Sequence, residues 1–145
     1  MAEYHQGKFK PRNPQKYRGN YNEIYYRSSW ELKFMIWADK SPAILEWNSE
    51  EVVVPYRCGT DNRIHRYFLD FWVKVKTNSG EIKTYLVEIK PEAQTKPPKQ
   101  PKRQTRRYLA EVNTFIKNQS KWKYATEYAK DRGMEFMVLT EKHLF

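Results

Sequence analysis

An acidic pair and a lysine stand in two segments of the chain that read as strands. Asp70 lies in the apolar run Tyr67–Trp72, and Glu88 and Lys90 are two residues apart in the run Leu86–Lys90. An acid inside so apolar a strand is unfavourable unless it is paired or holds a cation. Residues two apart in a strand project from the same face, and neighbouring strands lie about 4.8 Å apart. If these strands pair in a suitable register, Asp70 and Glu88 converge on one ion.

The chemistry expected of such a pair is that of a hard divalent metal. Two carboxylates and a backbone carbonyl, most naturally that of Ile89, suit Mg²⁺ or Mn²⁺. A bound metal lowers the pKa of its water and neutralises charge that grows on a phosphate. Lys90 would orient or deprotonate the water, or stabilise the pentavalent phosphate. The alternative is structural: Asp70 pairs with Lys90 or Arg66, and Glu88 faces solvent at a strand end.

Glu31 also has two interpretations. With Ser28 it has the S-x-x-E spacing of a capping box at the start of a helix that Ser41-Pro42 ends. The first interpretation makes Glu31 a capping residue at the third helical position. The second turns its carboxylate toward the sheet, where it could face Asp70 and act as a catalytic residue and further metal ligand. The helix is recognised from apolar residues at helical spacing, namely Trp30, Phe34, Trp37 and Ala38.

Three strands are expected between this helix and the next. A β-branched run predicts a strand over Glu51–Tyr56, and Arg63–Lys76 alternates so that its odd positions from Tyr67 to Val75 form one core face. Asn78-Ser79-Gly80 is typical of a turn, after which Glu81–Lys90 returns as a hairpin partner.

The second half of the chain predicts a loop, helices and a final strand. Lys96–Arg107 carries three prolines and no acid, which predicts an exposed basic loop. An amphipathic helix begins at Tyr108, and a second helical stretch ends at Gly133, a C′ residue. A short strand over Glu135–Leu139 completes the order helix, three strands, long helix, strand. This order predicts a single α/β domain over residues 28–145, with a mixed β-sheet flanked by helices.

Composition narrows the class of protein. The chain has 145 residues, about one domain, with 27 Lys+Arg against 17 Asp+Glu and a formal charge of +10. Residues 1–27 hold six Lys/Arg and five Tyr without a period, so they are expected to form a basic aromatic arm on the surface or on a partner. The charge favours a polyanionic partner such as nucleic acid.

Several kinds of chemistry are excluded by residue counts and spacing. The single cysteine, Cys58, rules out an internal disulfide and a cysteine-based zinc cluster. The five scattered glycines form neither a dinucleotide fingerprint nor a P-loop, so no small-molecule cofactor is expected. No apolar run approaches the roughly 18 residues of a membrane span, and Met1–Lys10 is polar, unlike a signal peptide. We therefore expect a soluble intracellular domain with no membrane partner.

The predicted DNA-binding surface is defined by its cations. Phosphates attract Lys and Arg, and tyrosines can stack on bases. Gln119 and Lys121, at the start of the second helical stretch, could touch the phosphate from the far side of the site, although a polar N-terminal turn also explains them. The alternative for the whole surface is a merely solvated charged face. The expected DNA-binding residues are Lys96, Lys99, Lys102, Arg103, Arg106, Arg107 and Lys121.

These residues resemble a known superfamily. The pattern is similar to that of the PD-(D/E)XK, or restriction-endonuclease-like, nucleases, whose core order is αβββαβ. It consists of Asp70, a spacing of 17 residues and then Glu88-x-Lys90, with Glu31 on a preceding helix. Leu69 stands where the superfamily name has proline. The chain resembles more narrowly the head-completion nucleases of tailed contractile phages, and also the nuclease subunit of transposases. The segments that carry this resemblance are Tyr4–Phe9, Tyr26–Glu31, Val87–Pro91 and Gln94–Pro98.

The resemblance implies a function and a set of roles. Glu31, Asp70, Glu88 and Lys90 would occupy the catalytic positions of a Mg²⁺- or Mn²⁺-dependent endodeoxyribonuclease. It would hydrolyse phosphodiester bonds of packaged double-stranded DNA in head completion and head-tail joining. It would work in the host cytoplasm during phage assembly, in association with the virion and with portal or head-tail connector proteins.

Two other functions remain open at this point. The chain could be a non-catalytic basic virion plug that binds DNA and portal, with acids that are structural. The retained Asp70, Glu88 and Lys90 favour the nuclease, because a plug has no need of that convergence. An RNA-binding module would lack its usual signatures here.

Overall fold

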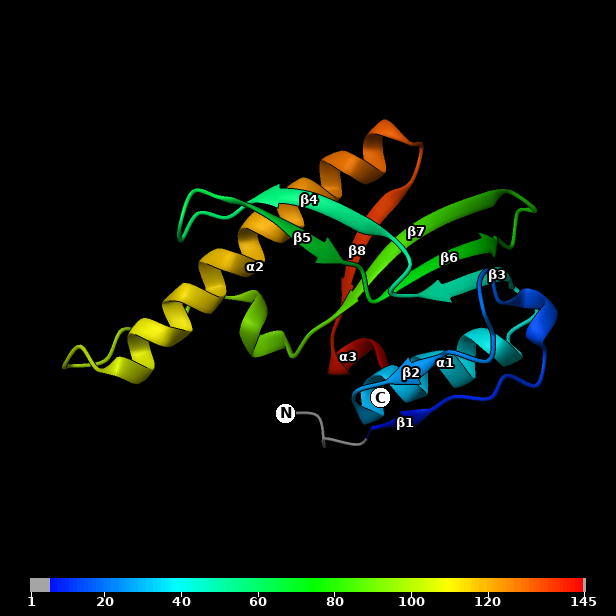
Figure 1. The fold of residues 1–145 in the computed structure, drawn as a ribbon, viewed down its shortest axis with the longest axis horizontal. Helices are drawn as coiled ribbons and strands as arrows, with labels where there is room; N and C mark the ends of the chain where they lie inside the picture. Colours follow the sequence, from blue (N-terminus) through cyan, green and yellow to red (C-terminus); the bar gives the residue numbers. More distant parts are fainter. Residues whose placement is uncertain (1–5, 145) are drawn as a thin grey trace.

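The computed structural model describes residues 6–144. The start of the expected arm, Met1–His5, and the last residue of the expected domain, Phe145, lie outside the described residues. A four-stranded mixed sheet in the order β3-β6-β7-β8 forms the centre of the molecule (Figure 1). Neighbours are antiparallel except β7 and β8, which are parallel. The strands are β3 (Ile44–Ser49), β6 (Phe71–Lys76), β7 (Ile82–Ile89) and β8 (Glu135–Leu139).

The sheet has a buried cluster on each face, as the alternation of side chains along a strand requires. Phe71, Val73 and Val87 pack with the apolar side of α1 (Ser29–Lys40). Leu86, one residue away from Val87, packs instead with Ala125 of α2 (Arg106–Asp131). Burying side chains of this size stabilises a fold by about 1.5–3 kcal/mol each. The expected α/β domain with a mixed sheet between helices is therefore confirmed.

The ends of α1 agree with the sequence pattern. The hydroxyl of Ser28 accepts a hydrogen bond from the Glu31 backbone N–H at 3.1 Å. The Glu31 carboxylate accepts from the Arg27 N–H at 3.2 Å, so the reciprocal bond of the capping box reaches one residue further back. The helix ends at Lys40, directly before Ser41 and Pro42.

The expected single strand over Arg63–Lys76 is wrong. It is two strands, because the chain leaves one sheet and enters another between Phe68 and Phe71. β5 (Ile64–Phe68) pairs with β4 (Val53–Arg57) in a separate hairpin, and Tyr67 and Leu69 are buried against α2 rather than α1. The edge strand β3 of the four-stranded sheet was not expected. It takes the place in the αβββαβ order that the strand over Glu51–Tyr56 was expected to fill.

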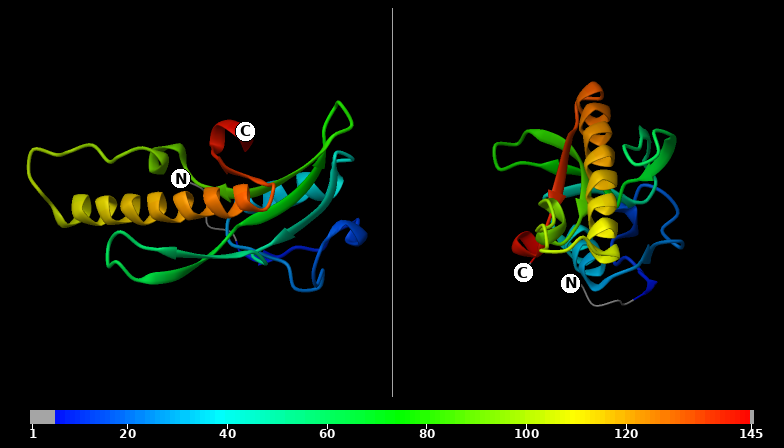
Figure 2. Two further views of the ribbon diagram at one scale, coloured as in Figure 1. Left: turned by 90° about the horizontal axis from the view of Figure 1, so that it is seen from above. Right: turned by 90° about the vertical axis from the view of Figure 1, so that its left-hand side faces the viewer.

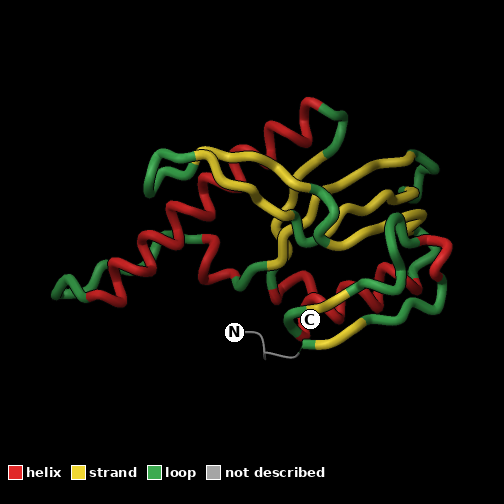
Figure 3. The backbone as a smooth tube through the Cα atoms, in the orientation of Figure 1, coloured by secondary structure: helices red, strands yellow, loops and turns green. Residues whose placement is uncertain are grey.

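The two expected helical stretches after the basic loop are one continuous helix. Figure 3 shows this helix without a break. α2 begins at Arg106, with Thr105 as its N-cap, so Arg106 and Arg107 lie in its first turn and not in the loop. Its end is as expected: Gly133 has a φ of +71°, and the Met134 N–H donates to the Ala129 carbonyl at 2.8 Å. Across residues 6–144 no helix is long and apolar enough to cross a membrane.

The segment 6–27 differs from the expected surface arm. It contains the short strands β1 (Gly7–Lys8) and β2 (Tyr25–Tyr26), which pair with each other beside α1. Phe9, Tyr17 and Ile24 are buried in the cluster that α1 shares with the sheet. Their spacing follows no period because the segment crosses the core only at these single residues.

Polar contacts at the end of α1 hold this segment in place. Between the two strands lies a short helical turn, η1 (Pro14–Lys16). The ammonium of Lys16 donates to the carbonyls of Ala38, Asp39 and Ser41 at 2.7–2.9 Å, and so caps the carbonyls that a helix end leaves unpaired. The Asp39 carboxylate accepts from the backbone N–H groups of Arg12 and Asn13.

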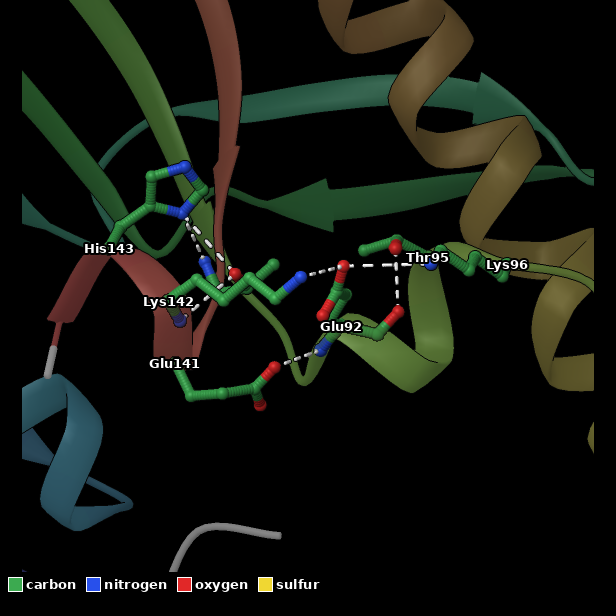
Figure 4. Close-up of polar contacts among 7 residues, drawn as sticks. Glu92, Thr95, Lys96, Glu141, Lys142 and His143 are labelled. Atoms are coloured by element: carbon green, nitrogen blue, oxygen red, sulfur yellow. Dashed lines mark hydrogen bonds and ion pairs between the residues drawn. The ribbon is translucent and has the colours of Figure 1, made fainter.

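The chain that follows β7 is tied to the C-terminus (Figure 4). Its first turn is η2 (Glu92–Thr95), and the last helix is α3 (Glu141–Leu144). The Glu92 N–H donates to the Glu141 carboxylate at 2.9 Å, and the Glu92 carboxylate lies 3.0 Å from the Lys142 ammonium. This contact with Lys142 lowers the pKa of Glu92. These contacts of Glu92 with Glu141 and Lys142 fix the path of the chain just beyond Lys90.

Candidate active site

Asp70 and Glu88 face each other across the two central strands. Phe71 of β6 is paired with Val87 of β7, and one step further along this antiparallel register Asp70 stands opposite Glu88. Oδ2 of Asp70 accepts a hydrogen bond from the Ile89 N–H at 2.8 Å. The register that the sequence analysis required is therefore present.

Glu88 is enclosed rather than solvent-facing. The residue is 5% exposed, and the Tyr67 hydroxyl donates a hydrogen bond to its Oε2. The Lys90 ammonium lies 3.7 Å from Oε1 of Glu88, as expected for residues on the same side of one strand. Burial and the nearby Glu88 raise the pKa of Tyr67, so its phenol remains a donor. Among the residues it describes, the structure does not show the pairings of the structural alternative. Glu88 is buried, Asp70 accepts from a backbone N–H, and Arg66 lies over the Phe68 ring.

Acidic side chains gather at this point of the sheet. Burial raises the pKa of Asp70 well above its ordinary value, and Glu88 and Glu31 raise it further, against the opposing effects of the Ile89 N–H and Lys90. Burial likewise raises the pKa of Glu31, with Glu50 and Glu88 adding to the effect. Because the anionic forms of Asp70 and Glu31 are both disfavoured, the cluster would gain from a bound cation.

Glu31 lies at the edge of this cluster, next to an ion pair that the sequence analysis missed. Arg27, whose N–H binds Glu31, also pairs with Glu50 at 3.0 Å through its guanidinium. The Glu50 N–H in turn donates to the Asp70 carbonyl at 3.2 Å. Glu50 has a φ of +57°, a backbone conformation that non-glycine residues adopt uncommonly. That conformation is visible only in the structure.

Lys121 lies near the carboxylates on the helix α2, which packs against the sheet. It lies in the middle of α2, so the N-terminal turn considered as an alternative is wrong. Its ammonium is 5.3 Å from the centre of the Tyr67 ring, whose hydroxyl binds Glu88. Burial lowers the pKa of Lys121, and Glu88 opposes that effect. Gln119, two residues earlier, is exposed.

The expected loop cations are on the surface. All six are exposed, and two of them have acidic partners: Lys96 lies 3.6 Å from Glu92, and Arg107 lies 3.1 Å from Glu111. The loop and the first half of α2 extend away from the sheet (Figure 2). These cations are therefore accessible to a polyanion, while Lys121 stands nearer the carboxylates.

The oxygen donors of this cluster suit a Mg²⁺ ion whose coordination is completed by water and phosphate. They do not suit an ion that is held by protein side chains alone. In the part of the chain that the structure describes, no three Asp, Glu, His or Cys side chains are grouped as metal ligands. Mg²⁺, however, usually binds through one or two carboxylates, and water and substrate phosphate complete its coordination. Asp70 uses only Oδ2 for the Ile89 N–H. The two facing carboxylates thus form a partial donor set of the kind that Mg²⁺ uses with a phosphate substrate.

Tyr67 is the other residue that the sequence analysis missed. It was assigned to the apolar core face by alternation, although a buried phenol normally finds a hydrogen-bond partner for its hydroxyl. Asp70, three residues later, was already the candidate ligand. Because unbroken alternation places residues three apart on opposite faces of a strand, the sequence carried no signal that joined the Tyr67 hydroxyl to the site.

The sheet order and the carboxylates that face each other on its central strands define the class, a small α/β domain built like a nuclease. The chain belongs to the family described as TnsA-like endonuclease N terminal, whose model matches residues 41–141. The chain is also 42% identical over 142 residues to the head completion nuclease of Enterobacteria phage T4, a match that covers 95% of this chain and 92% of that protein. The resemblance found from the sequence is confirmed. The family match includes Asp70, Glu88 and Lys90 and begins after Glu31.

Proposed function

We propose that this chain is a divalent-metal-dependent endodeoxyribonuclease that cuts packaged double-stranded DNA during completion of phage heads, before or during tail joining. The observation that carries the proposal is the pair Asp70 and Glu88, which face each other with Lys90 beside them. Membership of an endonuclease family and the printed name of the T4 relative support it. Its place of action would be the host cytoplasm during assembly, with the portal or a head-tail connector protein as the structural partner.

Each residue of the cluster has a proposed role in hydrolysis. The reaction joins one water oxygen to phosphorus and breaks the bond to one ester oxygen. Asp70, Glu88 and the Ile89 carbonyl would hold Mg²⁺ or Mn²⁺, with Glu31 as a further ligand. When bound, the ion would acidify water and offset charge on the phosphate. Lys90 would position or deprotonate the attacking water, and Tyr67 keeps the Glu88 carboxylate in place through its hydrogen bond.

Incubation of the purified chain with supercoiled plasmid tests this proposal. Nicked and then linear DNA should form with Mg²⁺ or Mn²⁺, without marked sequence preference, because phosphate contacts carry no sequence information. EDTA should prevent both products. Plasmid that stays intact with either metal, while still binding the protein, would favour the non-catalytic plug.

Glu31→Gln separates the capping role from the catalytic one. Glutamine can still accept the Arg27 N–H, so the free energy of unfolding should change by only a few tenths of a kcal/mol. Loss of the negative charge should slow plasmid cleavage roughly tenfold, about 1.4 kcal/mol of barrier. Glu127→Gln, at an exposed position on α2, is the matched control. Normal cleavage by Glu31→Gln would leave Glu31 a cap only.

The cations of the basic loop and of the first turn of α2 should control how DNA binding depends on salt. Each phosphate contact adds about 0.9 to the slope of log affinity against log salt, so the loss of four contacts should flatten it by roughly 3 to 4. Melting temperature should hardly move, because exposed charges contribute little to folding. An unchanged slope would assign the loop to a protein partner. The variant replaces Lys102, Arg103, Arg106 and Arg107 with Gln, and its control replaces Lys40, Arg63, Lys76 and Lys130.

A further inference from the structure

A groove of about 720 Å³ lies between the first half of α2 and the chain that leads into it. Residues 93–99 form one wall, and α2 from Arg107 to Asn118 forms the other. The two walls run alongside each other where this part of the molecule extends from the sheet (Figure 2). The residues of α2 that are buried are Asn118, Ala125 and Ala129, so the helix before Asn118 has little contact with the core.

The lining of the groove suits a flat, partly apolar group. Pro97 and Pro98 contribute from the loop, and Ala110 and Phe115 from the helix. A fully paired duplex keeps its base faces stacked inside the helix and offers a protein mostly phosphate and sugar. An unpaired nucleotide exposes the face of its base, which aromatic side chains bind by stacking. The apolar lining therefore favours unpaired nucleotides over duplex.

Asn118 gives the groove a specific donor. The residue is 3% exposed and lines the groove, and its Nδ2 has no hydrogen-bond partner within residues 6–144. A buried amide without a partner is unfavourable by roughly 1–3 kcal/mol, so a ligand acceptor at this position would relieve that cost. Base carbonyl oxygens and ring nitrogens are such acceptors.

The groove also has cations and lies close to the catalytic cluster. Lys96, Lys99 and Arg107 line it; Arg107 pairs with the lining Glu111 and Lys96 with Glu92, whereas Lys99 has no ion pair in the described part of the chain. Ala93 follows Lys90 by three residues. Asn118 precedes Lys121 by three, which places both on one side of α2. A strand in the groove would lead directly to the carboxylates.

We propose that this groove holds an unpaired strand of the substrate, so that the chain prefers duplex DNA that continues into a single-stranded arm. The inference rests on the proposed nuclease function and names the class of DNA that this site selects. A protein partner in the groove is the alternative outcome of the test below.

Binding without cleavage tests the preference directly. Fluorescence anisotropy in EDTA compares two labelled DNAs with the same number of phosphates, a blunt duplex and a duplex with one single-stranded arm. The wild-type chain should bind the armed duplex at least about tenfold more tightly, the scale of one stacked base. Equal affinity for the two DNAs would overturn the inference.

Variants of the groove sharpen the test. Phe115→Ala should remove about tenfold of the preference for the armed duplex and leave blunt-duplex affinity unchanged. Asn118→Leu, of similar volume, should reduce the preference severalfold without lowering the melting temperature, because it removes a buried amide nitrogen that has no partner among the described residues. Leu109→Ala, an exposed residue of the same half of α2 outside the groove, is the control. A preference that survives both groove substitutions would contradict the assignment.

The two proposals fail in different ways. If wild-type protein nicks plasmid with Mg²⁺ but binds both DNAs equally, the groove assignment is wrong and the nuclease stands. If the protein prefers the armed duplex but cuts no DNA with either metal, the groove assignment stands and the catalytic proposal is wrong.

Discussion

Asp70→Asn is expected to abolish DNA cleavage and to raise the melting temperature at neutral pH. Loss of one of the two facing carboxylates should reduce the cleavage rate roughly 100-fold or more, because it weakens metal binding and leaves charge on the phosphate uncompensated. Asparagine keeps an oxygen that can accept the Ile89 N–H, so the local hydrogen bond is retained. Plasmid cleavage in Mg²⁺ gives the rate, and thermal unfolding gives the stability.

The sign of the stability change follows from the raised pKa of Asp70. A carboxyl group whose pKa is higher in the folded state contributes stability while it is protonated, and that contribution is lost as pH rises through the folded pKa. The gain from Asp70→Asn should therefore be present at neutral pH and disappear below the ordinary carboxyl pKa of about 4. Asp61, whose pKa is lowered by the Arg63 N–H and by His65, is a control with the opposite sign. Wild-type cleavage by Asp70→Asn would end the assignment of Asp70 to the metal.

Lys90→Gln should give the second large effect. If Lys90 acts on the attacking water, its loss should slow cleavage by about 10²- to 10⁴-fold, the usual range for a positioned proton-transfer group. DNA binding in EDTA should change little, because the loop cations remain. Lys76→Gln, an exposed lysine at the far end of β6, removes the same charge from the same sheet and should cleave normally. A Lys90→Gln protein that cuts at the wild-type rate would make this lysine only a partner of Glu88.

Local signals predicted the features that depend on a few neighbouring residues. The cap at Ser28, the stop before Pro42 and the C′ role of Gly133 each follow from one short pattern, and each is present. Asp70 and Glu88 were expected to converge only if the register of their strands allowed it, and the hairpin that turns at residues 78–80 has that register. These features need no knowledge of the rest of the fold.

Features set by distant contacts could not be predicted in the same way. Unbroken alternation from Tyr67 to Val75 hides the change of sheet at Asp70, where Glu50 and Val52 bind the backbone of residues 70 and 69. Phe9 and Tyr17 both pack edge-on against the ring of Trp47, which buries them. A contact with so distant a residue produces no periodic pattern in the sequence around Phe9 and Tyr17. Lys121 comes near Glu88 only because α2 is one long helix that crosses the sheet.

Mapping the metal with iron tests the central claim most directly. Fe²⁺ in place of Mg²⁺, with ascorbate and peroxide, generates radicals that break the polypeptide close to the bound ion, and mass spectrometry locates the breaks. We expect breaks near Asp70 and Glu88 that excess Mg²⁺ suppresses and that Glu88→Gln eliminates. Breaks elsewhere in the chain, or the same breaks in Glu88→Gln, would contradict a metal site between β6 and β7.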